Sequence, residues 1–112
     1  RHRTIMENDK MEIAQQLQIV VGEVQAVRQQ IASLNAQVRE LEGTIVAVSK
    51  QPDDLALHRQ MGSILIEVED REQLMQDLKL TLDQMANAVE SMSQREKELV
   101  ETYDKLKESL EG

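Results

Sequence analysis

The stretch that decides the fold is SKQPDDLALHRQMGSILIEVE, residues 49–69, which separates two longer segments of helical pattern. It begins with turn-forming residues around Pro52, and proline ends an α-helix that reaches it. Residues 55–59 and 64–68 are rich in aliphatic side chains, and Gly62 supplies a turn between them. The stretch therefore predicts a β-hairpin with strands at 55–59 and 64–68.

The predicted hairpin is too small to be stable alone. An isolated two-stranded hairpin is marginally stable in water, and its unpaired edges accept strands from other chains. Ile64, Ile66 and Val68 alternate along the second strand, so they share one face of it. We therefore expect the hairpin to join the chain to partner subunits. The residues expected to carry this oligomerisation are Leu55, Leu57, Gly62, Ile64, Leu65, Ile66 and Val68.

Before the hairpin, apolar residues recur in alternating steps of four and three, which is the period of a coiled-coil seam. This first seam comprises Ile13, Leu17, Val20, Val24, Val27, Ile31, Leu34, Val38, Leu41, Ile45 and Val48. It contains no polar residue over about five heptads, which predicts a helix at 10–49 that packs against another helix.

A second seam follows the hairpin. It comprises Met75, Leu78, Leu82, Met85, Val89, Met92, Glu96, Leu99, Tyr103, Leu106 and Leu110. Asp70 and Gln73 resemble a capping box at the start of this helix, which is predicted at 70–110. The two seams have equal lengths, so the helices are predicted to form a long antiparallel coiled coil within a single domain, 1–112. This pairing places Glu96, the one charged member of the second seam, within reach of Arg28.

The composition disfavours several classes of protein. Aromatic residues make up 1% of the chain while 40% is hydrophobic, which suits packed helices better than a compact globule. The net charge of −8 disfavours nucleic acid as a partner, because phosphate backbones repel an acidic chain. No apolar run is long enough to span a bilayer, and without cysteine there is no disulfide framework. A cytoplasmic protein without membrane contact is therefore expected.

Motifs for catalysis and metal binding are also missing. There is no glycine-rich phosphate loop and no nucleophile paired with a base, so the chain is not expected to be an enzyme. His2 and His58 are isolated, and turn chemistry explains Asp53 and Asp54, so neither a metal ion nor a cofactor is expected. Residues 1–5 differ in character from the rest and are expected to be a remnant or a disordered tail outside the fold.

The hairpin stretch resembles the prefoldin beta family, most closely its archaeal members. The resemblance lies in residues 54–68, DLALHRQMGSILIEV. The family pattern has an acidic residue, then Val-Tyr-Lys, a glycine, an aliphatic run and a closing valine, and Gly62 and Val68 fit its later part. His58 and Arg59 depart from it, because they stand where the family has tyrosine and lysine. Alpha subunits carry a longer insert with two hairpins, so the single hairpin indicates a beta subunit.

This resemblance implies both an assembly and a function. It implies a mainly α chain whose hairpin joins an intersubunit β-barrel, in a hexamer of two alpha and four beta subunits with six coiled-coil arms. It also implies an ATP-independent chaperone, or holdase, which captures unfolded or nascent polypeptides and delivers them to a group II chaperonin. Such complexes use neither nucleotide nor metal.

Client binding is expected at the tip of the arm, where both helices end away from the hairpin. The terminal layers of a coiled coil lack neighbours on one side, so they fray and expose apolar side chains. Methionine suits such a site because its flexible thioether side chain adapts to many partners. The residues expected to bind clients are Met6, Met11, Ile13, Leu17, Ile19, Val21, Leu106 and Leu110.

Two other functions stay open on the sequence. A coiled-coil effector of transcript cleavage carries paired acids at its tip, and Asp53 and Asp54 lie near the bend. A structural tether needs only the helices and has no use for an aliphatic hairpin. Deleting residues 55–68 separates the tether from the chaperone subunit, because only the chaperone subunit would then lose its oligomeric state.

Overall fold

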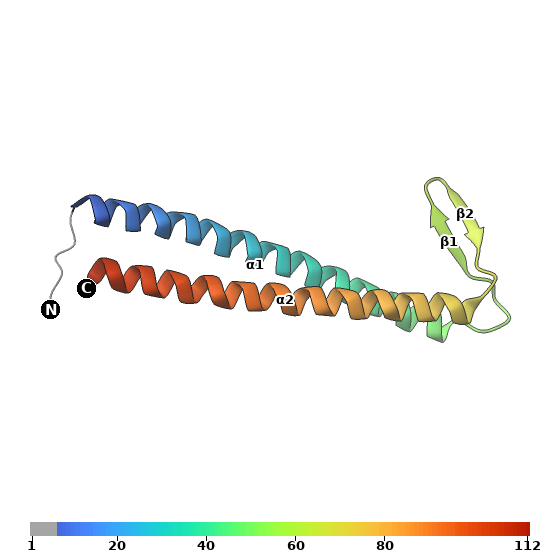
Figure 1. The fold of residues 1–112 in the computed structure, drawn as a ribbon. Coiled ribbons are helices and arrows are strands. Elements are labelled where there is room, and N and C mark those ends of the chain that lie inside the picture. Colours follow the sequence, from blue (N-terminus) through green and yellow to red (C-terminus); the bar gives the residue numbers. More distant parts are fainter. Residues whose placement is uncertain (1–6) are drawn as a thin grey trace. The chain divides into compact units, whose positions relative to one another are not determined.

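The structure is a computed structural model that describes residues 7–112. Helix α1 (Glu7–Lys50) is followed by strands β1 (His58–Met61) and β2 (Ile64–Glu67), and then by helix α2 (Arg71–Glu111) (Figure 1). Two long helices therefore flank a short antiparallel hairpin, as the fold class predicted. No helix among the described residues is long and apolar enough to cross a membrane.

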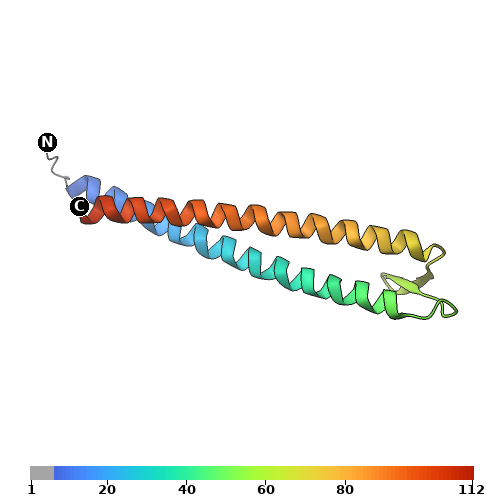
Figure 2. The same cartoon turned by 90° about the horizontal axis from the view of Figure 1, so that it is seen from below.

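The described residues form two units. The end unit comprises residues 7–33 of α1 and 89–112 of α2, and the hairpin unit comprises residues 34–88. Within the end unit, the two helix segments lie side by side and run in opposite directions (Figures 1 and 2). The hairpin unit holds the end of α1, both strands and the start of α2. That the whole chain is a single domain stays a prediction.

The end unit has a narrow aliphatic core that bridges its two helix segments. Its buried residues, and the partly buried ones packed against them, are Val20, Val24, Leu99, Val27, Val100, Tyr103 and Leu106. On the surface, Arg28 pairs with Glu96, and Nη2 of Arg95 lies 3.2 Å from a carboxylate oxygen of Glu23. The partner predicted for the charged member of the second seam is confirmed. Such exposed pairs contribute about 0–1 kcal/mol each.

The burial pattern follows the predicted seams along both helices. Every seam residue is buried or half-buried, while the positions between them are mostly exposed. This is the signature of a helix that buries one narrow stripe, and the predicted period is confirmed.

Helix α2 begins with a side-chain cap in the hairpin unit. The backbone N–H of Gln73 donates to Oδ1 of Asp70 at 3.0 Å, which satisfies one of the unpaired donors of the first turn. The return bond of a capping box, from the backbone N–H of Asp70 to the side-chain oxygen of Gln73, is not made, and the side chain of Gln73 lies toward Asp77, to whose Oδ1 its Nε2 donates at 2.8 Å. The predicted capping box was therefore half right.

The hairpin closes through a two-residue turn at Gly62 and Ser63. Met61 pairs with Ile64 on either side of it, and Gly62 has a φ of 64°, as the first central residue of a type II′ turn requires. Pairing continues to the backbone N–H of Val68, which donates to the carbonyl of Leu57 at 2.8 Å. These contacts fix which residues of the two strands face each other.

The first strand was predicted about three residues too early. The structure places β1 at His58–Met61, whereas 55–59 was expected. The backbone N–H of Leu55 donates to the carbonyl of Pro52 at 3.1 Å, so Leu55 belongs to the turn after α1. Leu55 therefore does not extend the sheet, although its side chain remains exposed beside it.

Candidate functional surfaces

The predicted client-binding residues fall into two groups within the end unit. Met11, Ile19 and Val21 are exposed on α1, with 58% of Met11 and 62% of Ile19 accessible to solvent. The other group is half-buried in the seam and consists of Ile13, Leu17, Leu106 and Leu110. Met6 lies outside the described residues. The first group can touch a ligand directly, whereas the second becomes available only if the helices separate there.

The end unit also carries a groove that the sequence did not predict. It has a volume of about 310 Å³ and is lined mainly by apolar surface. Its lining residues are Val21, Val24, Gln25, Arg28, Val100, Tyr103 and Asp104. In the sequence, Val24 and Tyr103 were assigned to seam packing only. One available signal was Tyr103 itself, the one aromatic residue in the two seams, whose ring differs in shape from the valines near it.

The hairpin has two chemically different faces. The pairs Arg59–Ile66 and Met61–Ile64 lie on the same side as Leu57 and Val68, because side chains of paired residues point to one face and alternate along a strand. This side, which we call the apolar face, contains one charged residue. The opposite, polar face carries His58, Gln60, Leu65 and Glu67.

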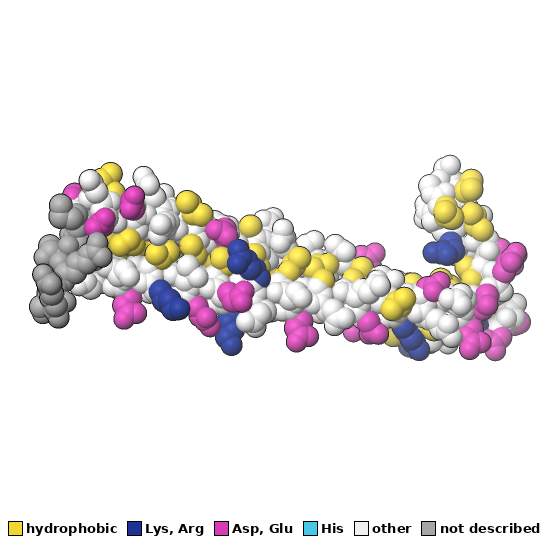
Figure 3. Space-filling view, viewed as in Figure 1, with side chains coloured by type: hydrophobic (Ala, Val, Ile, Leu, Met, Phe, Trp, Pro, Cys, Tyr) yellow, Lys and Arg dark blue, Asp and Glu magenta, His cyan; other side chains and the backbone are white. Residues whose placement is uncertain are grey.

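Within the part of the chain that the structure describes, most of the apolar face is open to solvent. Met61, Ile64 and Ile66 are all exposed, and hydrophobic side chains gather on the hairpin in the space-filling view (Figure 3). Exposed apolar patches of this kind mark interaction sites. Of the residues predicted to carry oligomerisation, Leu57, Ile64, Ile66 and Val68 lie on this face, whereas Leu65 points away from it.

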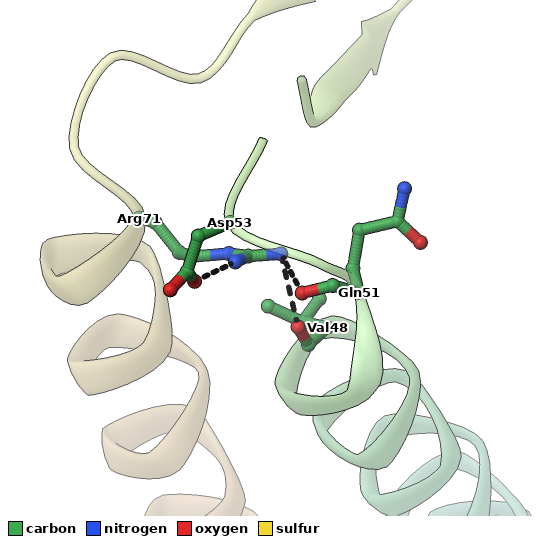
Figure 4. Close-up of polar contacts among 4 residues, drawn as sticks. All are labelled: Val48, Gln51, Asp53 and Arg71. Carbon is green, nitrogen blue, oxygen red and sulfur yellow. Dashed lines mark hydrogen bonds and ion pairs between the residues drawn. The ribbon is translucent and has the colours of Figure 1, made fainter. Parts of the chain in front are cut away.

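Arg71, the first residue of α2, forms hydrogen bonds to the end of α1 and to the turn that follows it. One guanidinium nitrogen donates to Oδ1 of Asp53 at 2.7 Å, and the other donates to the carbonyls of Gln51 at 2.6 Å and Val48 at 3.4 Å (Figure 4). The last carbonyls of a helix lack partners within it, and here the carbonyl of Val48 also accepts from the backbone N–H of Gln51 at 3.3 Å. The side chain of Arg71 thus caps the C-terminus of α1. Asp53 is engaged in this contact, which leaves the cleavage-factor alternative without its pair of free acids.

Replacing Arg71 by lysine is expected to lower the free energy of unfolding by about 1–3 kcal/mol, because an ammonium group cannot reproduce the planar fork that reaches all three oxygens. Urea unfolding followed by circular dichroism measures the change. Arg95→Lys is the matched control, since Arg95 makes a single exposed pair with Glu23, and it should cost less than about 1 kcal/mol. Equal losses in the two variants would contradict the role of Arg71.

Acidic side chains gather at the base of the hairpin (Figure 3). Together with Arg71, four of them line a second hollow. These residues are Asp53, Asp54, Glu67 and Glu69. Among residues 7–112, no three side chains of the metal-binding types lie close enough together to hold an ion. His58 lies on the polar face of the hairpin, across from Glu67.

Comparisons with known proteins agree with this architecture. A family model described as "Prefoldin subunit" matches residues 11–112. The prefoldin beta subunit of Thermoplasma volcanium is 26% identical over 102 residues, covering 91% of this chain and 80% of that protein. The beta subunit of Methanothrix thermoacetophila is 24% identical over 106 residues, covering 88% of each.

A solved structure gives the same picture at the level of the fold. The crystal structure of the prefoldin beta subunit from Thermococcus strain KS-1 aligns with a TM-score of 0.83 at 17% identity, covering 97% of this chain and 94% of that one. The resemblance drawn from the hairpin sequence is confirmed. Because the family model spans nearly all of the chain, the protein belongs to the prefoldin subunit family, a family of chaperone subunits rather than enzymes.

Proposed function

We propose that this protein is a subunit of an ATP-independent holdase, which captures unfolded or nascent polypeptides in the cytoplasm and delivers them to a group II chaperonin. The observation that carries the proposal is the set of exposed apolar side chains, Met11, Ile19 and Val21, on the end unit of a chaperone-family chain. Unfolded polypeptides expose apolar side chains of their own, and contact between the two removes both from water.

Capture is proposed to occur at the start of α1 and the end of α2, within the end unit. Met11 supplies an adaptable contact, and fraying of the last seam layers adds Ile13 and Leu110. Each contact is weak, so several arms must hold one client together. A client held in this way can be released one arm at a time, which requires no nucleotide.

Assembly is proposed to occur through the hairpin. Its apolar face and its free strand edges suit a β-barrel shared with an alpha subunit and other beta subunits in a hetero-hexamer. Acidic side chains exposed near the end of α2 would steer docking to a basic chaperonin surface. These side chains are Glu98, Glu101, Asp104, Glu108 and Glu111.

The proposal is tested by shortening the end unit. Removing residues 1–10 and 104–112 is expected to leave the mass of the assembled complex at its hexameric value, apart from the deleted residues, because the hairpin is untouched. The same change should weaken suppression of aggregation when a denatured test protein is diluted into buffer, because it removes Leu106 and Leu110 while the exposed Met11, Ile19 and Val21 remain. Light scattering measures aggregation and native mass spectrometry measures assembly.

A pair of substitutions repeats this test without changing helix length. The double variant Met11→Gln, Ile19→Gln should lose most of its protection, since both side chains are exposed on the end unit. The control double variant Val46→Gln, Leu80→Gln changes exposed apolar residues of the hairpin unit and should protect like the parent chain. Full protection by the double variant Met11→Gln, Ile19→Gln would refute client capture at these ends.

A further inference from the structure

The groove of the end unit has the size and lining of a side-chain pocket. Its volume of about 310 Å³ is near the lower limit for small-molecule sites, so it suits one large side chain better than a whole ligand. Val21 stands exposed at its rim, while Val24 is buried and Tyr103 is half-buried. An apolar side chain entering here would leave water and contact valine and tyrosine on both helices.

The charges at the groove are not balanced. Arg28 contributes a cation, but its guanidinium is engaged by the carboxylate of Glu96. Asp104 contributes an anion and makes no ion pair with any residue of the part that the structure describes. Glu101 and Glu108 flank Asp104 one turn away on either side, and Lys105 and Lys107 offset only part of the charge of these three acids. The open carboxylate at the lining favours a cation beside the apolar side chain.

We infer that this groove binds a single leucine- or phenylalanine-sized side chain of an extended, unfolded segment whose neighbouring residue is lysine or arginine. In an extended segment, adjacent side chains point to opposite sides and lie close together, so the anchor can enter the groove while the basic side chain curves toward Asp104. The inference rests on the proposed holdase function and adds to it a preference for clients with basic apolar segments.

Labelled peptides test the preference directly on the full chain by fluorescence anisotropy. One peptide carries leucine between lysines, a second carries leucine between glutamates, and a third carries alanine between lysines. The lysine–leucine peptide is expected to bind about fivefold more tightly than the glutamate peptide and about tenfold more tightly than the alanine peptide. The preference for lysine should shrink as salt is added.

Two pairs of variants locate the site. Asp104→Lys should abolish the preference for lysine over glutamate flanks, whereas Asp83→Lys, an equal change of charge on α2 in the hairpin unit, should leave it intact. Val21→Lys should weaken leucine-peptide binding about tenfold, whereas Val46→Lys, at a similarly exposed valine, should not. Both substituted valines are at least 38% exposed, so the helices should tolerate the changes.

The outcomes separate this inference from the holdase proposal. Equal binding of all three peptides, or equal effects of Asp104→Lys and Asp83→Lys, would overturn the inference about the groove. The holdase proposal would stand in that case if the parent complex still suppressed aggregation. Binding that needs lysine but not leucine would also overturn it, because that is simple attraction to an acidic surface. Failure of the parent complex to suppress any aggregation would remove the holdase proposal itself, and the groove inference with it.

Discussion

Replacing Ile66 by aspartate is expected to turn the assembled complex into separate chains. Ile66 lies on the apolar face of the hairpin, and a carboxylate there would have to be buried against the partner subunits. The lost burial of isoleucine alone is about 1.5–3 kcal/mol, so the dissociation constant should rise at least about tenfold per interface, and more with the cost of the buried charge. Sedimentation velocity measures the shift in mass.

The hairpin itself should survive this substitution. Residue 66 pairs directly with Arg59, so the new carboxylate gains an oppositely charged neighbour across the strands of its own chain. Leu65→Asp is the control, because Leu65 is even more exposed but lies on the polar face. The control should keep its assembly. Dissociation of both variants to the same extent would show that the two faces are not distinguished as proposed.

The helical part of the fold could be predicted because it follows from the spacing of apolar residues along each helix. A seam residue every three or four positions must be buried, and every position that this rule selected from Ile13 to Val48 and from Met75 to Leu110 is buried or half-buried. It also set which layers meet, so Glu96 could be matched with Arg28 in advance. The spacing of apolar residues and the equal lengths of the two seams were therefore sufficient to predict most of the helical part of the fold.

The predicted start of β1 was wrong because residues with strand propensity form a strand only where a partner strand is available to pair with them. The two-residue turn at Gly62 sets the pairing, and counting outward from it would place Leu55 opposite Asp70. Asp70 is occupied in capping α2, and the N–H of Leu55 is already used by Pro52. The partner strand thus ends before Leu55 is reached, which the composition of residues 55–59 does not reveal.

The Arg71 contact and the groove were missed for a different reason. Arg71 is an ordinary first residue of a helix in the sequence, and its importance comes from carbonyls of Val48 and Gln51, about twenty residues earlier in the chain. The groove likewise depends on how the Tyr103 ring and the valines fill the space between two helices. Periodicity tells which residues face a seam, but it does not measure the space that they leave.

Replacing Leu99 by alanine is expected to have the largest effect on stability of any single truncation in the end unit. Leu99 is 5% exposed and lies at the centre of the core with Val20 and Val24. Leucine-to-alanine changes in cores cost about 2–5 kcal/mol, and a narrow two-helix core that can partly collapse should fall toward the lower part of this range. Urea unfolding, followed by circular dichroism, gives the free energy.

Leu80→Ala provides the matched control for this prediction, because it makes the same chemical change on the same helix at a residue that is 58% exposed. Its cost should stay below about 0.5 kcal/mol, since alanine and leucine are both good helix formers and little apolar contact is lost. A loss at Leu99 as small as that at Leu80 would mean that the end unit is not held by this core. The burial of Leu99 between α1 and α2 would then contribute little to keeping the two helix segments together.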